Sequence, residues 1–520
     1  MKTIHKFLTI SLLFSFLLLL SCNSPNKEIF RYIPETAMAV ITFHPGNLLE
    51  KGKIRELNFL REEWSDNKIA AKIINDPENS GIHLDRYAAA FIAEGPDEYD
   101  CLLLPINKKT KFEQAVFEIE REEGLIRESG KMKESFDVIK LDNHLIVYGT
   151  FVALVFYDRE REGMTKLETI ANQLLDLERE FSILADKDFN NFLGKQKDLN
   201  AWFNSSNLKG IPLLGNLSGG MDELSGLNNN YGHVFIGFQK GNMTLSTNLR
   251  FNQSMQTTID KFNFLDEKAI KELLNYLPSK DLVFILNTNL NPEKIFDLLK
   301  FVNHDFESTL DQTIESLNMD PEEVKNAVSG EFALSFHGLK NSESLNFSDS
   351  TDLKNIPFIV TAFRIKDKVF FDKFLSIAEH NPDVAINDGY YTIYPGVIPI
   401  YLLLKGKDMI LSNEEPVIKE IAARGEVEQN VTRTEYAPVL IKNPVCFYLN
   451  LDKRSYSREI GDYLQNEMGS SISSGFETFG DQLKSLTFSA SLEEWEIRLD
   501  LKDTDEYSLY TLLSEMDKTK

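Results

Sequence analysis

Apolar residues recur with two different periods along this chain, and these periods predict which segments are strands and which are helices. Apolar positions alternating every second residue are typical of strands, whereas a spacing of three or four residues is typical of amphipathic helices. We expect strands over 39–43, 88–93, 101–106, 136–141, 145–148, 152–157 and 201–203, then a hairpin over 234–251. Helices are expected over 47–74, 112–121 and 166–180. Short turns rich in Gly, Asn and Asp join neighbouring strands, which favours antiparallel pairing and an α+β fold.

The order of these elements occurs twice in the sequence. Tyr32-Ile33-Pro34, before one predicted strand, is matched by Tyr276-Leu277-Pro278 at an offset of 244. Three further matches follow in the same order, namely Ala90-Phe91 with Ala333-Leu334, Phe112 with Phe371, and the alternating residues 243–249 with 495–501. Because the matches are collinear and join elements of the same kind, we expect a tandem duplication. The predicted products are two similar domains of mainly antiparallel sheet with packed helices, at 31–252 and 253–520.

The second copy is longer between Gly338 and Ile365, where a polar stretch occupies residues 340–355. Such a stretch predicts an inserted surface loop. Its Asp349-Ser350-Thr351 resembles the short acceptor motif for protein O-glycosylation in Bacteroidetes, and an unmodified loop is the simpler expectation.

The first 21 residues predict an export signal. A basic start precedes an apolar run over 7–20, fourteen residues long, and the chain turns polar after Cys22. A membrane-spanning helix needs roughly 20 apolar residues, so the run is too short to remain as a span. The string Leu19-Leu20-Ser21-Cys22 resembles a lipobox, which implies removal of residues 1–21, acylation of Cys22 and a short tether over 22–30. Two or three acyl chains hold a protein firmly at a membrane. The alternative is an ordinary signal peptide with an incidental cysteine.

The net charge argues against nucleic acid as a partner. Removing residues 1–21 takes away Lys2 and Lys6 and no acid, so the formal net charge of −24 becomes −26. Binding to a phosphate backbone requires clustered Lys and Arg, and the sequence holds no such cluster. We interpret the acidic balance as a well-solvated surface on a body without a second membrane-spanning run.

Two cysteines follow Cys22 in the mature chain. Cys101 and Cys446 both lie within apolar, strand-like runs. We expect both to be buried free thiols, and a single disulfide between them in an oxidising envelope is the alternative.

The start of the mature chain resembles a known family. Ile33-Pro34-Glu35-Thr36-Ala37-Met38-Ala39-Val40, followed by Leu48-Leu49-Glu50-Lys51, is similar to the opening of Bacteroidetes lipoproteins known only as a domain of unknown function. His44 stands where the family leads us to expect a small polar residue such as Asn. The resemblance implies an exported lipoprotein and its fold, and the family brings no assigned activity, cofactor or catalytic residue.

The sequence carries no recognisable catalytic, cofactor or metal motif. The Gly-rich stretch 215–221 lacks the Gly-Lys-Ser/Thr of a phosphate-binding loop, and its Ser218 is one position off a Gly-x-Ser-x-Gly elbow. The mature histidines are dispersed without the spacing of a zinc site, at His44, His83, His144, His233, His304, His337 and His380. We therefore predict no catalytic, cofactor-binding or metal-binding residue, and lipidation of Cys22 as the functional site.

These observations favour a non-catalytic cell-envelope lipoprotein. We expect a binding or scaffolding module attached to the membrane through its lipid anchor, with an envelope protein, a peptide or a glycan as its unknown partner. The alternative is an envelope hydrolase whose carboxylates or serine converge only in three dimensions. A glycan-capture lipoprotein of outer-membrane transporters has a similar length, but those proteins are helical repeats, and the alternating strands argue against that fold. Asn23 after the cysteine favours the outer membrane, with the body facing either the periplasm or the exterior.

Overall fold

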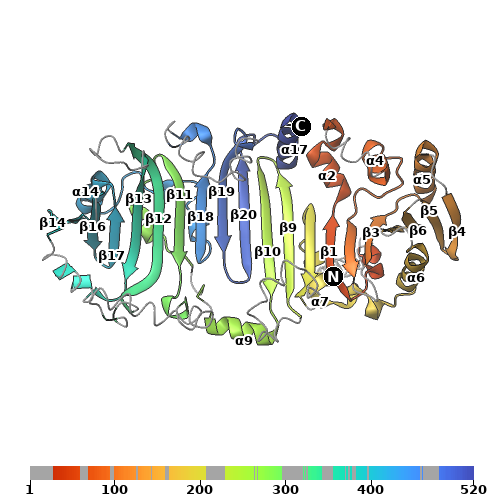
Figure 1. Cartoon of the computed structure of the whole chain (residues 1–520), viewed down its shortest axis with the longest axis horizontal. Helices are drawn as coiled ribbons and strands as arrows, with labels where there is room; N and C mark the ends of the chain where they lie inside the picture. The colour runs from red at the N-terminus through yellow and green to blue at the C-terminus, as the bar shows by residue number, and fades with distance from the viewer. Residues whose placement is uncertain are drawn as a thin grey trace, which may run out of the picture. The chain divides into compact units, whose positions relative to one another are not determined.

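The fold is described from a computed structural model of the chain (Figure 1). The structure describes residues 27–58, 68–93, 99–123, 127–141, 143–158, 163–205, 229–262, 264–265, 268–295, 320, 323, 326–341, 355–368, 371–372, 375–376, 382–394, 398–456, 460 and 479–519. The chain divides into two compact units, with the boundary between Phe235 and Ile236.

In the described part of the first unit, eight strands form antiparallel pairs. Their order in space is β4-β5-β6-β7-β3-β2-β1-β8, since β1 pairs with both β2 and β8 while β3 pairs with both β2 and β7. The strands are β1 (Ala37–Phe43), β2 (Ala88–Ala93), β3 (Tyr99–Pro105), β4 (Arg127–Lys133), β5 (Phe136–Leu141), β6 (His144–Tyr148), β7 (Val152–Tyr157) and β8 (Leu199–Asn204).

The sheet of the first unit buries apolar side chains on both of its faces. Val138 and Leu154 belong to one core cluster, whereas their neighbours Ile139 and Ala153 belong to another. Successive residues of a strand point to opposite faces, so the two clusters lie on opposite sides of the sheet. The helices of this unit are η1 (Glu28–Tyr32), α2 (Pro45–Gly52), η2 (Ile54–Glu56), α4 (Lys68–Asn75), α5 (Lys109–Glu123), α6 (Met164–Leu175), η3 (Arg179–Phe181), η4 (Ile183–Ala185) and α7 (Lys187–Leu193).

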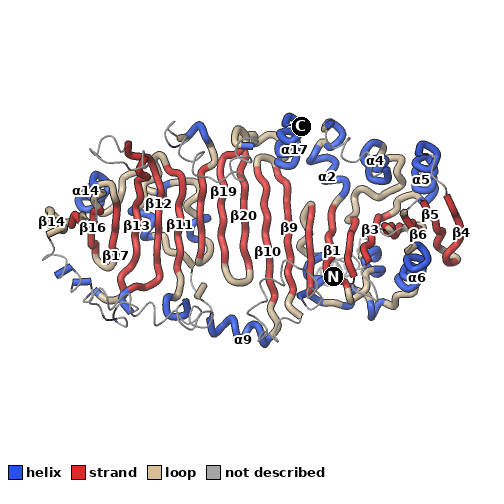
Figure 2. The backbone as a smooth tube through the Cα atoms, in the orientation of Figure 1, coloured by secondary structure: helices blue, strands red, loops and turns tan. Residues whose placement is uncertain are grey.

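The strands of the second unit, which are among the red segments of Figure 2, also form antiparallel pairs. Their order in space is β14-β15-β16-β17-β13-β12-β11-β18-β19-β20-β10-β9. They are β9 (Tyr231–Gln239), which contains the unit boundary, β10 (Asn242–Arg250), β11 (Leu282–Asn289), β12 (Val328–Asn341), β13 (Asn355–Ile365), β14 (Val384–Ile386), β15 (Tyr391–Ile393), β16 (Ile400–Lys405), β17 (Asp408–Ser412), β18 (Val445–Asn450), β19 (Leu483–Ala490) and β20 (Glu494–Leu501).

Helices complete the core of the second unit. Leu273 and Leu277, which precede β11, pack in one cluster with Ile418 and Ile421 from a helix that follows β17. The helices are α9 (Gln253–Phe262), η6 (Glu272–Tyr276), α14 (Glu415–Arg424), η8 (Val431–Arg433), η9 (Val439–Ile441), η10 (Lys453–Ser455) and α17 (Ser508–Thr519).

The two strand orders correspond strand by strand. The series β4-β5-β6-β7-β3-β2-β1-β8 becomes the series of the second unit from β14 to β18 when ten is added to each number. A local contact recurs as well, because Pro34 forms a β-bridge with Ser182 and Pro278 forms one with Asn430.

The predicted α+β class is confirmed, because a large antiparallel sheet occurs together with helices. Three predicted strands, 88–93, 136–141 and 152–157, have the bounds of β2, β5 and β7. Within the described residues, no helix is both long and apolar enough to span a membrane.

The prediction of one helix over 47–74 is wrong. Helix α2 ends at Gly52, because the next residue, Lys53, adopts a left-handed backbone conformation with φ 43°. A left-handed residue ends the hydrogen-bond ladder of a right-handed helix, which the apolar spacing alone does not reveal. A 3-10 turn follows at Ile54–Glu56, and α4 begins at Lys68.

Candidate functional site

The candidate site lies in the second unit, where two neighbouring strand pairs are irregular. The register of β11 with β12 shifts between Leu282 and Phe284, which leaves Val283 without an opposite residue. The register of β12 with β13 shifts between His337 and Leu339, which leaves Gly338 without one. Gly338 has φ +63°, the left-handed conformation of a glycine bulge. Such bulges redirect the side chains beside them, and here the residue beside the bulge is His337.

His337 forms a hydrogen bond with Glu414. The distance from His337 Nε2 to Glu414 Oε2 is 2.8 Å, and the side chains are 7% and 24% exposed. An ionised carboxylate only accepts hydrogen bonds. Nε2 therefore carries the hydrogen atom and donates the hydrogen bond to Glu414 Oε2. His337 Nδ1 is buried and has no hydrogen-bond partner among the described residues.

Glu414 is held at the start of α14. It is the N-cap residue of this helix, and its backbone N–H donates to Ser412 Oγ at 2.9 Å. A negative charge at a helix N-terminus is stabilised by the unpaired N–H groups there. The first turn of α14 thus fixes the position of the carboxylate that His337 contacts.

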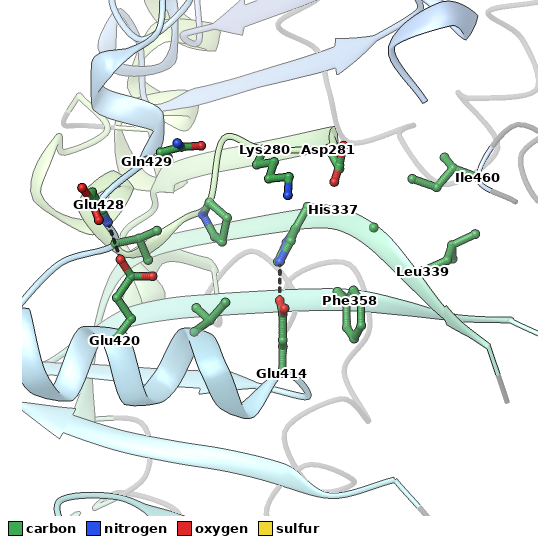
Figure 3. Close-up of a pocket in the computed structure, with 14 residues that line it drawn as sticks. Lys280, Asp281, His337, Leu339, Phe358, Glu414, Glu420, Glu428, Gln429 and Ile460 are labelled. Carbon is green, nitrogen blue, oxygen red and sulfur yellow. Dashed lines mark hydrogen bonds and ion pairs between the residues drawn. The ribbon is translucent and has the colours of Figure 1, made fainter. Parts of the chain in front are cut away.

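An open cavity of about 630 Å³ surrounds this pair (Figure 3). Its lining residues come from several elements that meet at the two bulges, and they are Pro278, Lys280, Asp281, His337, Gly338, Leu339, Phe358, Glu414, Val417, Glu420, Val427, Glu428, Gln429 and Ile460. Figure 3 shows Phe358, Leu339 and Ile460 on one side of His337, and Glu420 and Glu428 on the other. The cavity therefore has an apolar side and an acidic side.

Part of the acidic charge is compensated within the protein. Arg424 pairs with Glu428 and lies 3.9 Å from Glu420, and the backbone N–H of Glu428 donates to Glu420 Oε1 at 2.9 Å. Within the part of the chain that the structure describes, the side chains of Lys280 and Asp281 form no hydrogen bond or ion pair. Both remain available at the rim of the cavity.

A second histidine–carboxylate pair lies in the core of the first unit. His233 Nε2 is 2.6 Å from Asp188 Oδ2, and Trp202 Nε1 donates to the same oxygen at 3.2 Å. Burial, followed by the charge and hydrogen bond of Asp186, raises the pKa of Tyr231 beside this group to about 12. His233 is 1% exposed, so the pair has no access for a ligand, and we interpret it as structural.

The two cysteines are buried free thiols, as predicted from their apolar strands. Burial raises the pKa of both Cys101 and Cys446, which disfavours the reactive thiolate. The alternative of a disulfide between them is wrong, because each thiol is unpaired.

Several predicted positions lie outside the described residues. They are Cys22, His304, His380, the Gly-rich stretch 215–221 and the motif Asp349-Ser350-Thr351. Within the described residues, no group of three or more His, Cys, Asp or Glu side chains is placed to hold a metal ion.

Sequence reasoning treated the histidines as dispersed and missed the pairing of His337 with Glu414. These residues are 77 positions apart, and no sequence spacing connects them. One signal was available, because a glycine inside a strand-like run suggests a bulge, and Gly338 directly follows His337.

Comparisons with known proteins identify the family. The chain belongs to the family described as Domain of unknown function (DUF4836), which matches residues 33–509. This finding confirms the resemblance to a family of unknown function that the opening motif indicated. No curated protein matches the chain.

Two solved structures have a limited similarity to the chain. They are titled as crystal forms III and IV of TP0453, with 14% and 15% sequence identity and a TM-score of 0.26 each. Each match covers 45% of this chain, and 86% and 84% of the respective structure.

Proposed function

We propose that the protein is a non-catalytic lipoprotein of the cell envelope that binds a small ligand or a short segment of a partner in the cavity at His337 and Glu414. The observation that carries this proposal is the open cavity, in which a partly buried hydrogen-bonded pair lies between an apolar and an acidic side. Binding sites commonly combine an apolar lining with a few fixed polar groups.

A test is ligand-observed NMR of the full mature chain with mixtures of short peptides, oligosaccharides and small amines. We expect a subset of compounds to bind the wild type and to lose binding in Leu339→Trp, where a larger side chain fills the apolar side. Ile386→Trp is the matched control, because Ile386 is exposed on β14 and does not line the cavity. Equal binding to both variants would place the ligand elsewhere and contradict the proposal.

Hydrolysis is the second candidate, because a histidine paired with a carboxylate is the usual combination of a general base. Two features favour binding instead. The described lining residues include no Ser, Thr or Cys nucleophile, and His337 Nδ1, the nitrogen that would take a proton, is buried. Hydrolysis of an ester, peptide or glycoside substrate that is abolished in Glu414→Gln would reverse this order of preference.

We further propose that Cys22 is acylated and anchors the body to the outer membrane. Support comes from the lipobox-like string, and from the short distance along the chain to the first described helix, η1, which begins at Glu28. Six residues span at most about 20 Å, so the anchor would hold the folded body close to the bilayer. Mass spectrometry of the native N-terminus and membrane fractionation of Cys22→Ala test this. An unacylated N-terminus, or a variant that stays in the membrane fraction, contradicts it.

We also propose that residues 31–252 and 253–520 are two similar domains produced by duplication. The corresponding strand orders and the recurrent bridges of Pro34 with Ser182 and Pro278 with Asn430 support this. Backbone hydrogen bonds recur too, from Ile183 N to Ile33 O at 2.9 Å and from Val431 N to Leu277 O at 3.0 Å. An experimental structure tests the proposal by superposition of one segment on the other. A superposition that did not place β1 on β11 and β8 on β18 would overturn it.

A further inference from the structure

The charges around the cavity favour a positively charged ligand. Among the described residues that line it are four carboxylates, from Asp281, Glu414, Glu420 and Glu428, and one lysine, Lys280. Arg424 offsets one of these negative charges through its pairing with Glu428. The remaining excess is negative, and the whole chain has a formal net charge of −24, so cations are attracted and anions repelled.

Glu414 and Asp281 are the carboxylates best placed to receive such a ligand. Glu414 uses Oε2 for His337, and a carboxylate offers about four acceptor positions, so capacity for an N–H donor remains. Asp281 directly precedes β11 with φ 50°, and its side chain has no partner within the described residues. Figure 3 shows both residues around His337.

The apolar side of the cavity favours a ligand that has an apolar part as well as a charge. Phe358, Leu339 and Ile460 lie together on one side of His337 (Figure 3). An aromatic ring both contacts apolar groups and attracts cations through its face. The ring of Phe358 packs closely against Gly338, since a Cβ at that position would lie only 2.9 Å from the ring.

We propose that this cavity binds an amphipathic cation, in which a primary ammonium or a guanidinium group is joined to an apolar body. The cation contacts Glu414 and Asp281, and the apolar body lies against Phe358, Leu339 and Ile460. A basic side chain next to an apolar one in a peptide has this chemistry. The inference rests on the proposed binding function and specifies its ligand class.

Three probes that share a phenylethyl body and differ in the charge of their polar group test the proposal. They are 2-phenylethylammonium, 2-phenylethanol and 3-phenylpropionate, measured by titration calorimetry or ligand-observed NMR with the full mature chain at pH 7 and low ionic strength. The ammonium is expected to bind most tightly and the carboxylate most weakly. Added salt is expected to weaken binding of the ammonium more than that of the alcohol.

Substitution of an acidic or of a basic lining residue is expected to change ammonium binding in opposite directions. Glu414→Gln and Asp281→Asn each remove a negative charge and are expected to weaken ammonium binding by about fivefold. Lys280→Ala removes the lining cation and is expected to strengthen ammonium binding about as much. Lys368→Ala is the matched control, since Lys368 pairs with Asp372 on the surface and does not line the cavity. Asn tolerates the left-handed conformation of Asp281, and circular dichroism verifies that each variant is folded.

The outcomes separate the ligand class from the proposed function. Tightest binding by the ammonium, with the opposite responses of Glu414→Gln and Lys280→Ala, supports the proposal. If 3-phenylpropionate binds as tightly as the ammonium, or if the charge variants leave ammonium binding unchanged, the ligand class is wrong while the cavity remains a binding site. If none of the probes binds the wild type, this inference is overturned, and the NMR screen described above then decides whether the binding function itself survives.

Discussion

His233 and Asp188 form a buried histidine–carboxylate pair in the first unit, with 2.6 Å between Nε2 and Oδ2. Asp188 lies in the first turn of α7, and it also accepts the indole N–H of Trp202. One carboxylate therefore links a helix to β8 and β9. Removing one partner of such a group leaves the others buried without their hydrogen bonds.

We expect Asp188→Ala to lower the free energy of unfolding by about 3 kcal/mol, because it breaks a buried pair and leaves two donors unsatisfied. Urea denaturation monitored by circular dichroism measures this. The control is Asp372→Ala, which removes an exposed ion pair with Lys368 and is expected to cost less than about 1 kcal/mol. Equal losses in the two variants would show that the pair at Asp188 is not a special contributor to stability.

The start of α2 supplies a second prediction. His44 is the N-cap, and its Nδ1 accepts a hydrogen bond from the backbone N–H of Asn47 at 3.1 Å. His44→Ala is expected to lower the free energy of unfolding by about 1 kcal/mol, whereas His44→Asn is expected to preserve it, because Asn is among the best N-cap residues. Hydrogen exchange of the α2 amides measures the local effect. A greater loss in the Asn variant than in the Ala variant would mean that capping is not the role of His44.

Two glycines allow steric conflict to be separated from backbone strain. Gly81 and Gly406 both have positive φ, 75° and 63°, but a Cβ on Gly81 would lie 2.3 Å from the backbone N of Phe112, whereas nothing lies within 4 Å of one on Gly406. We expect Gly406→Ala to cost about 1–2 kcal/mol from strain alone. Gly81→Ala is expected to cost at least about 2 kcal/mol more, because backbone atoms must move. Thermal unfolding of both variants measures the two losses of stability. A smaller loss for Gly81→Ala than for Gly406→Ala would contradict the prediction.

The buried thiols predict how stability changes at alkaline pH. An unfolded thiol loses its proton near pH 8.5, whereas burial raises the pKa of Cys101 well above the ordinary value. Above about pH 8.5 the unfolded state therefore binds fewer protons than the folded state, and the free energy of unfolding falls as pH rises. Each buried thiol contributes at most about 1.4 kcal/mol per pH unit.

Cys101→Ala is expected to reduce this decline between pH 8 and 9.5, below the range in which the buried tyrosines titrate. Urea unfolding at several pH values measures the slope for the variant and the wild type. An unchanged slope would contradict the assignment of this pH dependence to Cys101.

The apolar pattern of the sequence predicted strands well where the strand itself is strongly apolar. For residues 88–93, 136–141 and 152–157 this pattern alone gave both the kind of element and its first and last residues. Strand β4 was missed, because Arg127–Lys133 is polar and glycine-containing and becomes a strand through its pairing with β5. Strand formation there depends on tertiary context, which local propensity does not capture.

The candidate site was the part least accessible from sequence. Its geometry depends on two one-residue register shifts, at Val283 and Gly338, that bring together residues from β12, β13 and the start of α14. A one-residue register shift changes which side chains are opposite one another across two strands, and the apolar pattern of either strand alone does not show it. The individual residues were visible in the sequence, whereas their convergence on His337 was not.

The pairing of β10 with β20 constrains the order in which the protein can assemble during synthesis. Asn242 is opposite Asp500 in this pair, so β10 leaves the ribosome long before its partner exists. Until then one edge of β10 stays open, and contacts so distant along the chain form slowly. Strand β10 therefore needs protection from edge-to-edge pairing with other chains until β20 has been made.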